Sequence, residues 1–239
     1  MQQIVDNMTI SRLRDVIMTE KSGTNPIELL RTHSLASAVQ DEIERLVLSG
    51  EFSSGAKLGE AQVASRLGVS RGPIREAFRG LEQAGVVRIE RNRGVFVREI
   101  ALEEADQNYV VRGALEELAG KLIAPRITDE EVRSLEAITK RIETALSRND
   151  IAACVGLNFE FHLRIIDLTQ NTKLINAYRR ITRELMLFRT KSHIPRESLK
   201  EHRGIIDALA SRDPKAASAA MLAHVEAGRR RMHAALKPT

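Results

Sequence analysis

The sequence is poor in several residue types, and each scarcity excludes a class of protein. Its 239 residues contain no tryptophan and one cysteine, Cys154, which excludes a disulfide scaffold. No apolar run approaches the roughly 20 residues needed to span a bilayer, and the first residues lack the apolar block of a secretory signal. Hydrophobic residues make up 43% of the chain, too many for a disordered protein. We therefore expect a soluble, cytoplasmic protein with a hydrophobic core.

Glycine and proline are also scarce, with 14 and 6 residues, and 29% of the residues are charged. This composition is typical of a mainly helical protein of one large or two modest domains. The net charge of +5 is too small to indicate nucleic acid by itself, but it is concentrated. From Arg66 to Arg98 there are eight arginines against three glutamates, 8 − 3 = +5. Arginine suits phosphate oxygens and guanine edges, although a run of charge is more often a solvated helix face.

Three segments can be distinguished along the chain. Residues 1–33 form an extension of unassigned role, with weak periodicity that allows a short helix near Thr9–Thr19. Residues 34–98 have sharper patterns: one helix begins after Ser34 as its cap, and a second covers about Glu60–Leu67 before Gly68. A third helix follows Ser70 and ends near Gly85, and the residues after it alternate as a two-stranded hairpin with a basic tip. Residues 101–236 contain only helical patterns.

Three helices followed by a hairpin indicate a winged helix-turn-helix. Arg71, Arg75 and Arg79 recur every four residues on the third helix, so they share one exposed face that fits a major groove. Ser70 and the first backbone amides of that helix could hold a phosphate. Arg91 and Arg93 at the hairpin tip would reach the DNA backbone or minor groove, and Gly94 permits a tight turn. The alternative is a small helical subdomain with a charged exterior.

The segment Gly68-Val-Ser-Arg-Gly-Pro-Ile-Arg-Glu-Ala77 resembles the GntR family of bacterial transcription regulators. The resemblance implies double-stranded operator DNA as partner. It also implies that the residues at the start of the third helix contact the DNA: Ser70, Arg71, Gly72, Pro73 and Arg75. Among them, Arg75 is the residue expected to read a base edge. Some relatives have a further DNA-contacting arginine where this sequence has Ala61, so we expect that contact to be missing.

The remaining residues, 101–236, predict an antiparallel all-α bundle of about six helices. Three histidines fall on the apolar faces of three different helices: His162, His202 and His224. A single histidine on such a face is usually a core residue, but three in one bundle each need a partner for the ring nitrogens. A shared metal would satisfy all three. Asn158 lies one helical turn before His162 and can point to the same place.

This spacing resembles the FCD ligand-binding domain of FadR-type GntR regulators. In the metal-binding branch of that family, four such positions hold a divalent ion, commonly zinc or nickel. The ligands implied here are Asn158, His162, His202 and His224. The family often has aspartate where this chain has Asn158, and a neutral amide oxygen is a weaker ligand for a dication.

The same resemblance implies a small carboxylate effector at the open metal positions. Arg112, on the first bundle helix, could pair with that carboxylate. The alternative is an ion pair between Arg112 and Glu116, four residues later on the same helix. We expect a homodimer, because one short recognition helix offers little contact and paired half-sites match two-fold symmetry.

Three functions remain open at this point. The first is a metal-containing, ligand-responsive transcription factor, most often a repressor in this family. The second is a DNA-binding protein whose bundle is a metal-free dimerisation module, with the histidines linked through water. The third is a metalloenzyme fused to a winged helix. The sequence disfavours the third because it lacks an H-E-x-x-H motif, a phosphate-binding glycine loop and a nucleophile elbow. We therefore expect no enzymatic activity.

Overall fold

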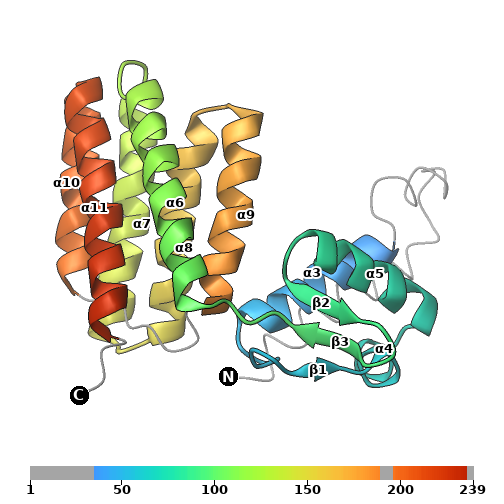
Figure 1. Cartoon of the computed structure of the whole chain (residues 1–239). Helices are drawn as coiled ribbons and strands as arrows, with labels where there is room; N and C mark the ends of the chain where they lie inside the picture. The colour runs from blue at the N-terminus through green and yellow to red at the C-terminus, as the bar shows by residue number, and fades with distance from the viewer. Residues whose placement is uncertain (1–34, 189–195, 236–239) are drawn as a thin grey trace, which may run out of the picture.

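The structure is a computed structural model that describes residues 35–188 and 196–235. Within these ranges it contains nine helices and three short strands, arranged as a small winged helix-turn-helix and a bundle of six helices (Figure 1). The predicted mainly helical fold class is confirmed. Two expectations lie outside the described residues: the extension 1–33 with its helix near Thr9–Thr19, and the capping role of Ser34.

The first part of the described chain follows the predicted order of elements. Helices α3 (Leu35–Leu48), α4 (Glu60–Leu67) and α5 (Arg71–Gln83) precede strands β2 (Val87–Glu90) and β3 (Gly94–Val97). Gly68 ends α4 in the left-handed conformation, with φ of 68°, and its N–H donates to the carbonyl of Ala64. Helices α4 and α5 are thereby separated by a turn of three residues.

The expected two-stranded hairpin is in fact part of a three-stranded antiparallel sheet. Strand β1 (Lys57–Leu58) pairs with β3, which also pairs with β2, so the order is β1-β3-β2. Two residues are too few to show an alternating pattern, which is why the sequence did not indicate β1. The tip between β2 and β3 has Asn92 at φ 62° and Gly94 at φ 112°, which is the tight turn expected there.

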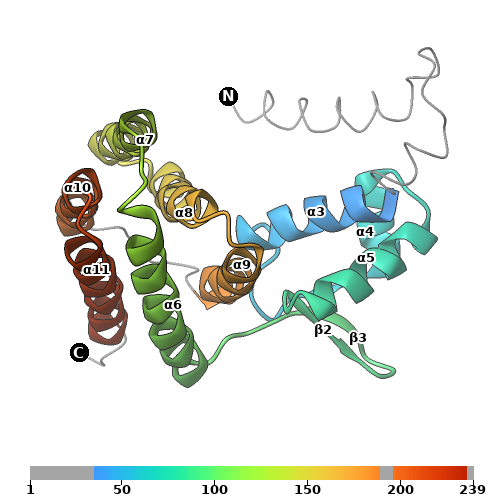
Figure 2. The same cartoon turned by 90° about the horizontal axis from the view of Figure 1, so that it is seen from above.

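The bundle contains six described helices, in agreement with the expected number of about six. They are α6 (Leu102–Ile123), α7 (Asp129–Ser147), α8 (Ile151–Leu168), α9 (Thr172–Phe188), α10 (Arg196–Ala210) and α11 (Pro214–Ala235). Thr128 and Glu131 form a capping box at the start of α7. Helix α6 packs against α11 on one side and α9 on the other, and α10 packs against α11 and α7 (Figure 2). None of the helices in these ranges is both long and apolar enough to cross a membrane.

Helix α9 joins the bundle to the winged helix. Leu185 and Leu187 of α9 are buried in the same hydrophobic cluster as Phe78 and Leu81 of α5. Two ion pairs flank this contact: Arg183 of α9 donates to Glu44 of α3 at 2.5 Å, and Arg98 at the end of the wing donates to Glu184 of α9 at 3.2 Å. The two parts therefore share a core.

Candidate functional site

The three histidines singled out from the sequence come together inside the bundle. His162 lies on α8, His202 on α10 and His224 on α11, and each offers a ring nitrogen within 4.8 Å of the others. The side chains of His162 and His202 are fully buried and that of His224 is 7% exposed. The apolar faces that hold these helices together thus turn the three imidazoles toward one point.

Each of two histidines has a carboxylate beside its Nδ1 atom. His224 Nδ1 is hydrogen-bonded to Glu201 Oε2 at 2.7 Å. Arg231 of α11 donates to both carboxylate oxygens of Glu201, at 2.7 and 2.9 Å, and to the hydroxyl of Ser198 at 3.2 Å. His162 Nδ1 lies 3.2 Å from Glu116 Oε2, an ion-pair distance without hydrogen-bond alignment.

Glu116 connects this cluster to the arginine proposed from the sequence. Its Oε1 atom accepts from Arg112 Nε and from the hydroxyl of Tyr178, both at 2.7 Å. The ion pair considered as the alternative role of Arg112 is therefore present, and both partners are buried. Arg112 nevertheless also faces a cavity next to the histidines.

Burial and neighbouring charges fix the protonation states around Glu116. Burial alone would raise the pKa of Glu116, but the charge of Arg112 and the nearby His162 outweigh it and hold the pKa well below its usual range. Burial lowers the pKa of His162 to about 4, although Glu116 opposes that shift. Burial and the other two histidines also lower the pKa of His202. At neutral pH Glu116 is an anion, while His162 and His202 are neutral imidazoles.

His202 is the most unusual member of the cluster. Both its ring nitrogens are buried and have no hydrogen-bond partner within the described ranges. The ring stacks on Phe161 with centroids 4.4 Å apart. Leaving a buried polar group unpaired costs about 1–3 kcal/mol. Three imidazoles, two of them held neutral, are a nitrogen donor set that suits zinc, nickel or copper, so the residues fit a transition-metal ion.

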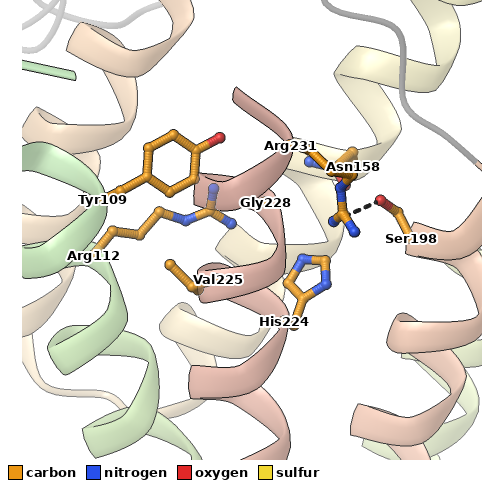
Figure 3. A pocket seen from close by; sticks show the side chains of 8 residues that line it. All are labelled: Tyr109, Arg112, Asn158, Ser198, His224, Val225, Gly228 and Arg231. Carbon is orange, nitrogen blue, oxygen red and sulfur yellow. Dashed lines mark hydrogen bonds between the residues drawn. The ribbon is translucent and has the colours of Figure 1, made fainter. Parts of the chain in front are cut away.

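Asn158, the fourth predicted ligand, lies beside this cluster in a small cavity of about 20 Å³ (Figure 3). Its side chain is 5% exposed. Tyr109 and Arg112 lie on one side of the cavity, from α6, and Ser198 lies on the other side, from α10, with His224 between them. A cavity of this size holds about one water molecule. Sequence reasoning missed Tyr109, Ser198, Glu201 and Arg231 as parts of this site.

The residues predicted to contact DNA lie on the exposed side of α5 and at the wing. Ser70, Arg71, Gly72, Arg75 and Arg79 are exposed, and Pro73 is half-buried. The Ser70 hydroxyl makes no capping hydrogen bond to α5. Arg75 Nε donates to Glu60 and Arg79 to Glu76, each at 3.0 Å.

Arginine side chains of the wing lie over an aromatic ring. Arg91 and Arg93 are exposed and Gly94 is half-buried. Arg88 and Arg93 lie over the ring of Phe96, 5.0 and 5.8 Å from its centroid. This stacking holds the guanidinium groups close to the wing while leaving their edges exposed.

Comparison with known protein families matches both parts of the chain. Residues 35–97 match the profile for bacterial regulatory proteins of the gntR family, and residues 107–227 match the FCD domain. A similar relative is the probable D-xylose utilization operon transcriptional repressor of Paenarthrobacter nicotinovorans. It is 34% identical over 204 residues, which cover 83% of this chain and 88% of that protein.

This chain belongs to the GntR family of transcriptional regulators and carries an FCD domain.

A second relative agrees with this assignment, and two solved structures share the fold. The transcriptional repressor RspR of Escherichia coli K12 is 25% identical over 213 residues, covering 87% of this chain and 91% of that protein. The structure of E. coli McbR/YncC matches with a TM-score of 0.76 at 18% identity, over 86% of this chain and 100% of that one. A GntR regulator from Rhodococcus sp. RHA1 matches with a TM-score of 0.73 at 23% identity, with the same coverage. Because the two relatives from Paenarthrobacter nicotinovorans and Escherichia coli are transcriptional repressors, the expectation that this GntR protein is not an enzyme is confirmed.

Proposed function

We propose that this GntR regulator is an operator-binding repressor whose DNA affinity is controlled by a small carboxylate at a metal ion in the bundle. The observation that carries the proposal is His202, whose two buried nitrogens have no partner in the described chain and face two further histidines. Two of the relatives are named as repressors, which supports the direction of regulation.

DNA recognition is assigned to α5 and the wing. The Ser70 hydroxyl, which does not cap α5, and the first amides of this helix would bind a phosphate, with Arg71, Gly72 and Pro73 close to the DNA backbone. Arg75 would read a base edge after leaving Glu60, with Arg79 farther along the same face. Arg91, Arg93 and Gly94 at the wing would contact the DNA backbone or minor groove.

These roles predict different effects for two arginine variants. Arg75→Ala should weaken binding to the operator by about 1–3 kcal/mol and relax base preference, because a bidentate base contact is lost. Arg91→Ala should weaken binding to every sequence alike. Fluorescence anisotropy would measure both variants on an operator selected from a random library and on scrambled DNA. Equal losses on the two DNAs for Arg75→Ala would refute its base-reading role.

A homodimer is supported by the outer face of α6. Four large hydrophobic side chains there remain between 39% and 53% exposed: Val110, Val111, Leu118 and Leu122. They recur with helical spacing along a single helix, whereas other exposed large hydrophobics are scattered. We assign this face to a second copy of the chain, which would present two winged domains to paired half-sites.

Charge placed on the α6 face should separate the protomers. Leu118→Asp should convert a dimer, twice 26.7 kDa, to a monomer at micromolar concentration, because a carboxylate would be buried in an apolar interface. Ile151→Asp is the matched control, since Ile151 on α8 is 41% exposed and Leu118 is 42% exposed. Size-exclusion chromatography with light scattering would measure both. If the Leu118→Asp variant remained a dimer, the α6 face would not be the dimer interface.

The metal is assigned to His162, His202 and His224, with Asn158 as the fourth ligand. Zinc or nickel suits this imidazole-rich set. A bound ion would act as a Lewis acid that holds an anionic oxygen. The amide of Asn158 is neutral, so we expect weaker metal binding than a site with a carboxylate in that place.

Elemental analysis of untagged protein, purified without chelator, tests this site. We expect about one zinc or nickel per chain, lost in His202→Ala because a ligand is removed. His233→Ala is the control, since His233 is an exposed histidine of α11 that pairs with Asp106. Native protein without metal after soaking in zinc or nickel would mean that Asn158 has disabled the site.

A carboxylate effector is supported by the charge balance of the site. The ion pairs Arg112–Glu116 and Arg231–Glu201 each sum to zero, so a dication would add two positive charges that these residues do not neutralise. An anion would neutralise them, with Arg112 as a second contact. The cavity holds about one water, so the effector must enlarge it, and α6 and α9 would transmit that change to the winged helix.

The effector assignment predicts metal-dependent control of DNA binding. A screen of small carboxylates against the metal-loaded dimer should find one that weakens operator affinity about tenfold, which is a typical coupling of about 1.4 kcal/mol. The same compound should have no effect after the metal is removed by chelation. Anisotropy titrations would measure both states. Operator affinity that is unchanged by every saturating carboxylate would refute this form of regulation.

A further inference from the structure

The contact between His162 and His224 cannot be an ordinary hydrogen bond if both imidazoles are neutral and both donate through Nδ1. The two Nε2 atoms are 3.1 Å apart. A neutral imidazole carries one proton, so a histidine that donates through Nδ1 has only a lone pair on Nε2. Glu201 is a carboxylate next to Nδ1 of His224, and Glu116 is a carboxylate next to Nδ1 of His162. In that arrangement two lone pairs face each other, which is unfavourable unless a cation lies near both.

We propose that Glu116 and Glu201 are positioning residues that fix His162 and His224 as the tautomers whose Nε2 lone pairs face the shared centre. The inference rests on the proposed metal site, but it concerns residues that are present in the chain. Metal-binding histidines commonly donate their other ring N–H to a carboxylate, which fixes the tautomer and makes the ligand more basic. Here His224 is hydrogen-bonded to Glu201 in this way, and His162 has the carboxylate of Glu116 3.2 Å from its Nδ1 atom.

Both carboxylates are themselves held in place, which is what a positioning role requires. Glu201 receives two hydrogen bonds from Arg231, which hold both of its carboxylate oxygens beside His224. Glu116 is held by Arg112 and Tyr178. Neither carboxylate is free to swing toward the centre and become a ligand without breaking these bonds.

His202 differs from the other two histidines because it has no carboxylate partner among the described residues. Its ring is oriented instead by stacking on Phe161. Either of its nitrogens can therefore carry the proton, so its tautomer is set only when a ligand binds. His162 and His224 thus have their tautomers fixed before a cation binds, whereas the tautomer of His202 is set by the cation.

Glu201→Gln gives the cleaner of two tests, because Glu201 is partly exposed and its loss should not prevent folding. A glutamine amide is neutral and can turn its NH₂ group toward Nδ1, which would favour the opposite tautomer. We expect the Zn²⁺ affinity, measured by competition with a chelator, to fall about 10- to 100-fold. Glu197→Gln is the matched control, one turn earlier on α10 and exposed, and should bind Zn²⁺ like the wild type.

A second measurement reports the tautomers directly and does not require bound metal. Long-range ¹H–¹⁵N spectra of chelator-treated protein with ¹⁵N-histidine should show protonated Nδ1 and unprotonated Nε2 for His162 and His224. Glu201→Gln should change the pattern of His224 alone, and Glu116→Gln that of His162 alone. A purely structural role for either glutamate would leave the tautomers unchanged.

The outcomes separate this inference from the proposed function. Protonated Nε2 atoms in the wild type, or tautomers and Zn²⁺ affinity unaffected by Glu201→Gln, would overturn the positioning role. Wild-type protein that shows the expected tautomers but binds no Zn²⁺ would support positioning and refute the metal site. Weakened Zn²⁺ binding with the expected loss of tautomer control in Glu201→Gln would support both.

Discussion

The buried carboxylate of Glu116 is the constraint on which the arrangement of the bundle depends. A charge without solvent is tolerated only with cationic and hydrogen-bonding partners, and Glu116 has Arg112, Tyr178 and His162 around it. These residues come from α6, α9 and α8. Any displacement of one of these three helices against the others would leave an unpaired charge in the core, so they are held in register by more than apolar packing.

The histidine cluster differs from Glu116, because its polar groups are incompletely hydrogen-bonded in the fold. The same apolar helix faces that stabilise the bundle by burying Ile165, Ile206 and Met221 also bury His202, which has no hydrogen-bond partner among residues 35–188 and 196–235. A leucine in its place would fill the space without that cost. Folding stability therefore gives no reason for an imidazole there, and this is the physical ground for assigning the cluster to a ligand.

The sequence was sufficient for features that depend on local pattern. The 3.6-residue period placed His162, His202 and His224 on inward faces, and Gly68, Ser70 and Gly94 marked the turn and wing correctly. It was insufficient where a partner comes from a distant helix. Glu201 directly precedes His202, yet it bonds His224, and Arg231 reaches it from α11. Such pairings depend on which helices are neighbours, and a periodicity argument contains no information about that.

The path from the site to the DNA-binding domain runs through α6 and α9, which are joined at Glu184. Arg112 lies one turn after Asn108 on α6, and Asn108 donates to Glu184 at 3.0 Å. Tyr178 lies six residues before Glu184 on α9, and Arg98 at the end of the wing donates to the same carboxylate. Glu116 and Glu184 therefore connect α6 and α9 at two positions along their length. A ligand that draws Arg112 away from Glu116 would change the restraint at one of these positions, and the helices are stiff enough to carry that change to Arg98. Because Leu185 and Leu187 are buried against the winged helix, we expect a shift of α9 to move the DNA-binding domain with it.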